Sequence, residues 1–347
     1  MKKLRVGLSR RFRNADGSPA IPEFDMSPLV DDPRIECVEL PEKSALAVSD
    51  LESLDAVLLG LETIDRASFA ETNRLVLAAR FGVGYDRIDV DACTANAVAL
   101  AITPDGVRRA VAVAVITFML ALTTKLVRKD RMVRDGPAAW ARKAEHNGFG
   151  LEGRVLGSLG IGNIGAEVFR LARPFGMRHI AHDPFAAEET FAALDVAPVP
   201  LEQLFAEADV LTVNCPLTEH TRGIVDEKNL RRMKPSAYLI NTARGPIVDQ
   251  RALARALADG VIAGAGLDVF ETEPVDAGDP ILAADNVLLA PHALAWTDQS
   301  MAAIGAADVR AVHAVMRGEP PEFVVNRAVL DDERFREKLR AVARRLG

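Results

Sequence analysis

Three residues that could carry out acid–base chemistry on a small anion are spaced along the second half of the chain: Arg244, Glu273 and His292. Each comes at or shortly after the end of an apolar run, and ligands of doubly wound sheets bind where the strands end. An arginine can offer a bidentate fork to a carboxylate, and a histidine titrates near neutral pH. Simpler roles, a surface ion pair for Arg244 and a turn position for His292, are the alternatives.

A glycine-rich segment in the middle of the chain could bind phosphate. Residues 155–165 read VLGSLGIGNIG, so that G-x-G-x-x-G follows an apolar strand and opens a predicted helix over residues 166–173. Gly160 permits a tight turn, Gly162 lets the backbone approach a pyrophosphate, and Gly165 lets the helix pack on the strand. The unpaired N–H groups at the start of the helix then bind the anion without a basic side chain.

Asp183 is the residue expected to select the dinucleotide. It lies about twenty residues after the glycines, where a carboxylate at the end of the next strand accepts hydrogen bonds from both ribose hydroxyls of an adenosine. The same charge would repel a 2′-phosphate, and no arginine immediately follows in Asp183-Pro184-Phe185. The sequence therefore predicts NAD rather than NADP, with a turn or helix cap as the structural alternative for Asp183.

Composition and charge limit the partners that the chain can have. Its 347 residues exceed one domain of about 150 residues, which predicts two domains. The 42 basic and 49 acidic residues give a net charge of -7, so we expect neither a nucleic-acid nor a membrane partner. Cys37, Cys93 and Cys215 form no C-x-x-C pair and no metal-ligand spacing, which favours a reduced, cytoplasmic protein without a metal site.

Neither of the two apolar stretches that resemble export or membrane signals fits such a role. Residues 4–9 are followed by Arg10, Arg11 and Arg13 and lack the apolar core of a signal peptide. The most apolar run, residues 110–122, is shorter than the roughly 20 residues that cross a bilayer. We expect a first strand and a buried helix, respectively.

Alternation of short apolar runs with polar, helix-like segments predicts a parallel α/β architecture. The predicted strands are residues 4–9, 56–59, 75–79 and 98–102, and then 155–159, 179–182, 210–213, 238–241, 263–267 and 287–289. Between the two series, the segment Thr103-Pro104-Asp105-Gly106 should break the pattern before one long helix over residues 107–133.

The end of the chain should be helical. One helix is predicted over residues 297–316, before the Gly and Pro residues at 318–321. The tail beyond residue 331 then places four apolar residues at helical spacing, at Phe335, Leu339, Val342 and Leu346. This amphipathic tail could dock on a partner chain or on the active-site mouth, or pack on its own domain.

Taken together, these motifs resemble the D-isomer-specific 2-hydroxyacid dehydrogenase family, which includes glyoxylate/hydroxypyruvate reductases and phosphoglycerate dehydrogenases. They occur in the family's order and cover roughly residues 50–326. The segments that carry the resemblance are RFGVG at 80–84, the glycines at 160–165, Pro216-Leu217-Thr218 with Thr221, NTARGPIVD at 241–249, LDVFETEP at 267–274, and Pro291-His292.

The resemblance implies roles for individual residues. His292 would exchange a proton with the substrate, Glu273 would hold its ring as an ionised partner, and Arg244 would bind substrate and stabilise charge on its oxygen. The substrate carboxylate would meet the backbone N–H groups of Val83 and Gly84, near Arg80. The residues implied around NAD are Gly160, Gly162, Asn163, Ile164, Gly165, Asp183, Asn214, Cys215, Pro216, Thr221, Thr242, Ala243, Arg244, Asp268 and His292.

Within that set, Asp268 would face the nicotinamide carboxamide, and Cys215 with Pro216 would flank the ring. Cys215 reads as a wall of the site rather than a nucleophile, because no base neighbours it in the sequence.

Three positions depart from the family's pattern. The chain has Val113-Ala114 where members often carry Glu-His, Asn214 where they often carry His, and residues 293–296 (ALAW) where a glycine-rich stretch is usual. Trp296 could shape the substrate pocket or serve as an aromatic anchor between domains.

The resemblance also implies the architecture: a Rossmann-type cofactor domain at residues 105–296, inserted into a flavodoxin-like substrate domain made of residues 1–104 and 297–347. We expect an NAD-dependent oxidoreductase, a homodimer through residues 110–122, that interconverts a D-2-hydroxy acid and a 2-oxo acid. Glyoxylate, hydroxypyruvate, a phosphorylated hydroxy acid and a bulkier 2-oxo acid all remain open as substrates. The rival functions are an NAD-sensing corepressor or scaffold, and hydride transfer from formate or phosphite.

Overall fold

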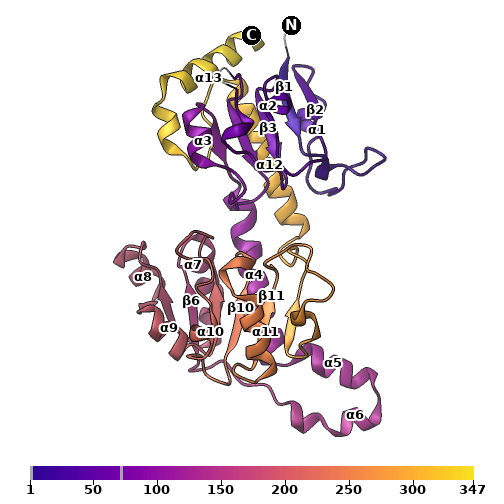
Figure 1. Cartoon of the computed structure of the whole chain (residues 1–347), viewed down its shortest axis with the longest axis vertical. Coiled ribbons are helices and arrows are strands. Elements are labelled where there is room, and N and C mark those ends of the chain that lie inside the picture. Colours follow the sequence, from indigo (N-terminus) through magenta and orange to yellow (C-terminus); the bar gives the residue numbers. More distant parts are fainter. Residues whose placement is uncertain (1–2, 71–72) are drawn as a thin grey trace. The chain divides into compact units, whose positions relative to one another are not determined.

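The computed structural model describes residues 3–70 and 73–347, and it divides into two compact units (Figure 1). Unit 1 comprises residues 1–107 and 296–347, and unit 2 comprises residues 108–295. Each unit has one parallel sheet with helices around it. The predicted α/β fold with two doubly wound parallel sheets is confirmed.

The sheet of unit 1 has the strand order β2-β1-β3-β4-β5, with every neighbouring pair parallel, which is the flavodoxin-like order. Its central strand is buried along its whole length, as expected for a sheet covered on both faces. The edge strand β2 was not predicted, because the glutamates at positions 36 and 39 interrupt the apolar run in its sequence, IECVE. The strands are β1 (Leu4–Leu8), β2 (Ile35–Glu39), β3 (Ala56–Leu59), β4 (Leu77–Arg80) and β5 (Ala99–Ala101).

The helices of unit 1 come from both ends of the chain. They are α1 (Ser27–Val30), α2 (Val48–Leu51), α3 (Val90–Ala95), α12 (Asp298–Met316) and α13 (Glu333–Leu346), with 3-10 turns η1 (Arg10–Phe12), η2 (Arg66–Ser68) and η7 (Arg327–Asp331). Thr297 caps α12, since its Oγ1 accepts a hydrogen bond from the Ser300 N–H at 3.1 Å.

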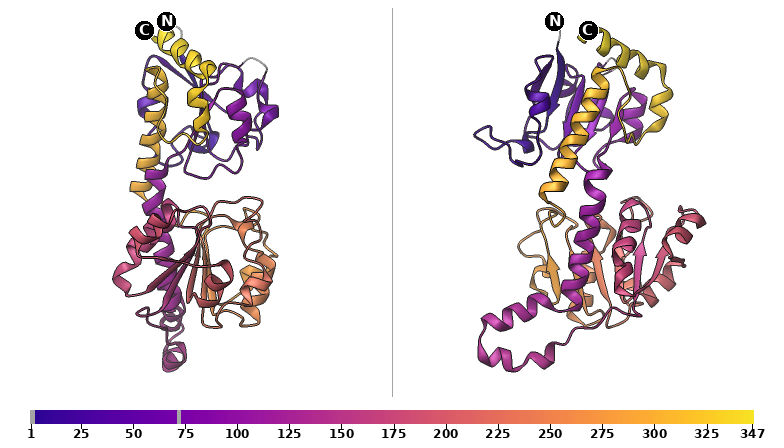
Figure 2. Two further views of the ribbon diagram at one scale, coloured as in Figure 1. Left: turned by 90° about the vertical axis from the view of Figure 1, so that its left-hand side faces the viewer. Right: turned by 180° about the vertical axis from the view of Figure 1, so that it is seen from behind.

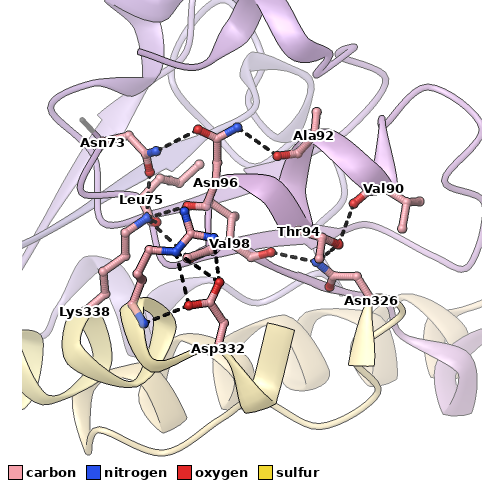
Figure 3. Close-up of polar contacts among 12 residues, drawn as sticks. Asn73, Leu75, Val90, Ala92, Thr94, Asn96, Val98, Asn326, Asp332 and Lys338 are labelled. Carbon is pink, nitrogen blue, oxygen red and sulfur yellow. Dashed lines mark hydrogen bonds and ion pairs between the residues drawn. The ribbon is translucent and has the colours of Figure 1, made fainter. Parts of the chain in front are cut away.

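The tail helix α13 packs on its own unit, the second of the two predicted alternatives. All four of its spaced apolar residues are buried in the core that also contains β1 and α12. A polar contact fixes the register: Lys338 Nζ donates hydrogen bonds to Asn73 Oδ1 at 2.8 Å, to the Leu75 carbonyl at 2.9 Å and to the Asn96 carbonyl at 2.7 Å (Figure 3).

The sheet of unit 2 has the order β12-β11-β10-β9-β6-β7-β8 and is also parallel throughout. The six predicted strands are present, and the short edge strand β8 adds a seventh. The strands are β6 (Val155–Leu159), β7 (Arg178–His182), β8 (Ala197–Pro198), β9 (Val210–Val213), β10 (Tyr238–Asn241), β11 (Gly264–Leu267) and β12 (Val287–Leu289).

Short helices connect these strands. They are α7 (Asn163–Ala172), α8 (Glu188–Leu194), α9 (Leu201–Glu207), α10 (Glu227–Leu230) and α11 (Gln250–Ala258), with 3-10 turns η4 (Arg173–Phe175), η5 (Gly245–Ile247) and η6 (Pro280–Ala283).

The predicted single helix over residues 107–133 is wrong. The segment forms α4 (Pro104–Thr123) and α5 (Leu126–Arg134), separated where Lys125 takes a left-handed backbone with φ 56°. Pro104 starts α4 instead of breaking the pattern, because a proline lacks only an N–H that the first turn leaves unpaired. After α5, α6 (Pro137–Ala141) and η3 (Lys143–His146) complete an arm that extends away from the sheet of unit 2 (Figure 2).

The helix α4 is also longer than its apolar run suggested. Its 20 residues include a window with mean hydropathy 1.7, so by length and composition alone it could cross a membrane. Half of that window is buried inside the protein, and the core helices of soluble proteins meet the same criterion. Residues Ala112, Val115, Phe118 and Met119 belong to the core of unit 2.

Candidate active site

His292 and Glu273 form a hydrogen-bonded pair beyond the ends of β11 and β12 in unit 2. The His292 Nδ1 atom lies 2.8 Å from Glu273 Oε2, and both side chains are partly exposed. The other carboxylate oxygen, Oε1, accepts a hydrogen bond from the Phe270 N–H at 3.1 Å. Both oxygens of Glu273 are therefore fixed, and the ring of His292 is held from one side.

The electrostatics of the pair keep Glu273 ionised. Burial alone would raise the pKa of Glu273, but the hydrogen bond and charge of His292, with the charge of Arg244, lower it below its usual value. An ionised carboxylate at Nδ1 stabilises the proton on that nitrogen, which leaves Nε2 as the ring atom for proton exchange.

Asp268 holds the backbone that follows His292. It comes directly after β11, is almost fully buried, and accepts hydrogen bonds from the Ala293 N–H at 3.0 Å and the Leu294 N–H at 3.1 Å. Burial raises the pKa of Asp268, although these two N–H groups oppose the shift. His292 itself has a left-handed backbone, with φ 55°. The sequence did not predict these two hydrogen bonds, because no pattern in residues near Asp268 or near Ala293 indicates that the two segments meet.

Arg244 is placed by the turn after β10. The Asn241 side chain bridges this turn, donating to the Arg244 carbonyl at 2.9 Å and accepting from the Ala243 N–H at 3.0 Å. The next residue, Gly245, lies so close to Phe270 that a Cβ atom there would collide with the Phe270 backbone. The turn with Arg244 thus packs against the segment with Glu273, which is why the charge of Arg244 reaches that carboxylate.

The glycine-rich segment has the geometry of a phosphate cradle. Gly160 has φ 93°, and a Cβ atom there would lie 2.9 Å from the Cys215 nitrogen; one at Gly165 would lie 2.6 Å from the Gly160 carbonyl. At Gly162, no atom of residues 3–70 or 73–347 outside its chain neighbours lies within 4 Å of the Cβ position, so the backbone there is accessible. The first helical hydrogen bond of α7 runs from Ala166 to Gly162, and the N–H groups of Asn163, Ile164 and Gly165 precede it.

Asp183 follows β7 and contacts that same segment. Its Oδ2 accepts a hydrogen bond from the Ile161 N–H at 2.9 Å, and its Oδ1 accepts one from the Phe185 N–H at 3.0 Å. The structural role considered for Asp183, a turn cap, is therefore present. Each carboxylate oxygen retains a lone pair that could accept a ribose hydroxyl.

Of the buried polar side-chain atoms that have no hydrogen-bond partner among the described residues, two lie just past strand ends of unit 2: Asn214 Oδ1 beyond β9 and Thr242 Oγ1 beyond β10. Buried polar atoms are normally paired, so both fit a ligand that binds along this edge of the sheet. The cradle and these two atoms are of the kind that fits a bound dinucleotide.

Cys215, Pro216 and Thr221 lie in the loop that follows β9. Burial raises the pKa of Cys215 to about 12, so its sulfur is a protonated, apolar thiol at neutral pH. The Thr221 hydroxyl donates to the Pro216 carbonyl at 2.6 Å and accepts from the Thr218 N–H at 2.7 Å, which fixes the loop.

The remaining candidates, Arg80, Val83, Gly84 and Trp296, belong to unit 1. Arg80 ends β4, and its guanidinium donates a hydrogen bond to the Phe81 carbonyl. The loop that follows is pinned by Thr103, a residue that sequence reasoning did not single out: its Oγ1 accepts from the Gly82 N–H at 3.0 Å and donates to the Gly82 carbonyl at 3.2 Å.

Comparison with known proteins identifies the family of the chain. A family model described as the D-isomer specific 2-hydroxyacid dehydrogenase, NAD binding domain, matches residues 116–293. A glyoxylate reductase of Korarchaeum cryptofilum is 38% identical over 295 residues, 84% of this chain and 89% of the relative. One of Pyrococcus furiosus is 36% identical over 322 residues, 90% of this chain and 94% of the relative.

Solved structures give the same result. The D-lactate dehydrogenase of Aquifex aeolicus, complexed with NAD and lactic acid, superposes with a TM-score of 0.78 at 27% identity, covering 90% of this chain and 96% of its own. The NADPH-dependent glyoxylate/hydroxypyruvate reductase of Sinorhizobium meliloti, complexed with NADP and malonate, also gives 0.78 at 27% identity, covering 93% and 97%. The chain therefore belongs to the D-isomer specific 2-hydroxyacid dehydrogenase family, as an NAD(P)-binding oxidoreductase.

Proposed function

We propose that the protein interconverts a 2-oxo acid and a D-2-hydroxy acid, with His292, Glu273 and Arg244 as the residues that act on substrate. The observation that carries this proposal is the 2.8 Å pair between His292 and Glu273. It lies at the edge of a sheet whose other strand ends carry the phosphate cradle and the unpaired Asn214 and Thr242 atoms.

The chemistry assigned to each residue follows from its contacts. His292 Nε2 gives a proton to the carbonyl oxygen of the 2-oxo acid, and Glu273 stabilises the imidazolium before that transfer. Arg244 binds the substrate and stabilises the negative charge on its oxygen. The backbone N–H groups of Val83 and Gly84, with Arg80, bind the carboxylate. The bound dinucleotide supplies or accepts the hydride at the carbonyl carbon.

NAD is the proposed cofactor, held by the residues of the cradle, by Asp183 and by the wall at Cys215 and Pro216. The position of Asp183 supports NAD over NADP. Its carboxylate accepts a hydrogen bond from the Ile161 N–H in the glycine-rich segment, where its negative charge would repel a 2′-phosphate. We assign unit 2 to the cofactor domain and unit 1 to the substrate domain; the predicted bounds, 105–296 for the first and 1–104 with 297–347 for the second, differ from these units by at most three residues. Three free cysteines favour the cytoplasm as the compartment.

An assay of NADH and NADPH oxidation with glyoxylate, hydroxypyruvate and pyruvate tests the proposal. We expect turnover of at least one of these acids, with a higher kcat/KM for NADH than for NADPH. Binding of NADH measured by calorimetry, without oxidation by any 2-oxo acid, would instead support the sensor or scaffold role. The glyoxylate reductases among the relatives make glyoxylate the first substrate to try.

A homodimer through α4 and α5 is the proposed assembly. Val113 on α4 is 45% exposed, and Leu126 and Val133 on α5 are 59% and 58% exposed, which is unusual for several large apolar side chains on neighbouring helices. Light scattering should give twice the chain mass. The pair Leu126→Glu and Val133→Glu should give the monomer mass, and a monomeric parent chain would contradict this assembly.

A further inference from the structure

Trp296 has a large apolar side chain that the core of unit 1 only partly buries. Its side chain is 51% exposed. One edge packs on Phe81, with the ring centroids 6.2 Å apart at an interplanar angle of 69°. Edge-to-face geometry of this kind is a favourable aromatic contact, so the indole is held in place while half of it stays open.

Phe81 is itself held rigidly. Its ring lies 5.2 Å from that of Phe24 and 5.8 Å from that of Phe12, and these two rings lie 4.7 Å apart. Phe12 and Phe24 are buried in the core of unit 1. The cluster therefore anchors the indole to the core, and we call Phe81 and Trp296 together the aromatic wall.

The aromatic wall stands beside the residues proposed to bind substrate. Phe81 lies between Arg80 and Gly82, directly before the proposed carboxylate-binding residues Val83 and Gly84. Trp296 is four residues after His292, and a chain of that length spans at most about 14 Å between Cα atoms. Thr297 then caps α12, which fixes the backbone at the indole.

We infer that the aromatic wall receives the side chain of the substrate, so that the protein prefers 2-oxo acids with a bulky apolar group on C3 over glyoxylate and pyruvate. This inference rests on the proposed function. Glyoxylate has no C3, and C3 of pyruvate is only a methyl group, so neither acid covers an indole. An isopropyl or phenyl group on C3 removes apolar surface from water on both partners.

The experiment compares kcat/KM with saturating NADH for pyruvate, 4-methyl-2-oxopentanoate and phenylpyruvate, which share the ketone and carboxylate and differ in the apolar group. We expect at least a tenfold increase from pyruvate to either bulky acid, because one methylene in a fitted apolar pocket already changes kcat/KM by roughly tenfold or more. Trp296→Ala should remove most of this preference, and Trp296→Phe should retain part of it.

The matched control is Trp140→Ala. Trp140 lies on α6 and is 53% exposed, close to the exposure of Trp296, but it belongs to unit 2 and to no proposed substrate contact. Its substitution should leave the ratio between bulky and small substrates unchanged.

A binding measurement keeps Trp296 intact. The chain contains two tryptophans, so Trp140→Phe leaves Trp296 as the only indole. With NAD⁺ and a 2-oxo acid no turnover occurs, because both are oxidised. Saturating 4-methyl-2-oxopentanoate should shift or quench the Trp296 emission, whereas pyruvate at its own saturation should change it little.

Three results would overturn the inference: a preference of the parent chain for pyruvate over both bulky acids, a Trp296→Ala variant that loses rate equally with all three, or equal emission changes with both acids. The second result would identify Trp296 as a domain anchor. In each case the enzyme still reduces 2-oxo acids, so the proposed function stands. Reduction of none of them overturns the proposed function and this inference together.

Discussion

Two carboxylates act on different parts of His292. Glu273 bonds the ring through Nδ1, and Asp268 bonds the two N–H groups that follow the residue in the chain. His292 has a left-handed backbone, a conformation that costs free energy for residues other than glycine. The hydrogen bonds from Ala293 and Leu294 to Asp268 help to offset that cost. Orientation of the ring and position of the backbone are thus controlled separately.

Asp183 is expected to set the cofactor preference. Combining Asp183→Ala with Phe185→Arg, at a position 90% exposed, removes the charge that repels a 2′-phosphate and adds one that attracts it. The ratio of kcat/KM for NADH over NADPH should fall by roughly tenfold or more, the effect of about one charged hydrogen bond.

Asp183→Asn is the control for the turn, because an asparagine oxygen can still accept one of the two backbone hydrogen bonds. An unchanged cofactor ratio in the double variant would mean that Asp183 acts only as the cap seen at Ile161 and Phe185.

Residue types in ordered motifs were enough to place Glu273 near His292 and Asp183 near the glycines, because each follows a strand of one parallel sheet. The contacts of Asp268 with Ala293 and Leu294, and of Thr103 with Gly82, could not be predicted. They depend on which backbone groups two separate loops bring together, and hydrophobic periodicity carries no such information.

Helices and strands were predicted well where a local residue pattern determines them, and poorly where a contact with a distant segment does. The buried strands β3, β6, β9 and β10 were predicted to the residue, since buried parallel strands are short apolar runs. The break between α4 and α5 was not predicted, because neither Gly nor Pro occurs there. There the Phe149 N–H, from a distant segment, donates to the Thr123 carbonyl at 3.0 Å and takes the place of a helical donor.

The helix α13 should depend on Lys338. Burial lowers the pKa of Lys338 to about 8, and its Nζ is the donor for Asn73, Leu75 and Asn96 (Figure 3). Lys338→Met keeps the apolar stem but leaves these acceptors unpaired, which should lower the free energy of unfolding by about 1–3 kcal/mol. Chemical unfolding at pH 7 measures the loss.

Arg344→Met on the exposed side of the same helix is the matched control and should change the unfolding free energy by at most about 0.5 kcal/mol. Equal effects of the two substitutions would mean that the apolar residues of α13 alone hold it to unit 1.

For the molecule as a whole, length predicted two domains, and the motifs predicted that one is inserted into the other. Unit 1 contains segments from both halves of the chain, with α12 packed in the same core as β1 and β4. The helix α12 carries one buried carboxyl group, that of Asp308, which is 1% exposed and whose Oδ2 has no hydrogen-bond partner in the described part of the chain.

Asp308 should make stability depend on pH. Burial raises its pKa to about 7 from 3.8, while the charge of Arg80 opposes the shift. The folded state then binds the proton more tightly than the unfolded state, so the stability present at acidic pH is lost as pH rises through about 7. The loss is at most about 4 kcal/mol, from roughly three pKa units.

Asp308→Asn removes the titration, so the variant should gain stability relative to the parent between pH 5 and pH 8 in urea unfolding. Asp91→Asn, at an exposed position on α3, is the control and should show no such gain. A parent chain equally stable at both pH values, with no relative gain in Asp308→Asn, would show that this carboxyl is charged in both states.

Single-turnover reduction of a 2-oxo acid by His292→Gln measures whether His292 exchanges the substrate proton. We expect a rate lower by a factor of roughly 10² to 10⁴, with the Kd for NADH nearly unchanged and with His146→Gln as an active control. If His292→Gln binds NADH and reduces the same acid at the parental rate, His292 is not the residue that exchanges the proton.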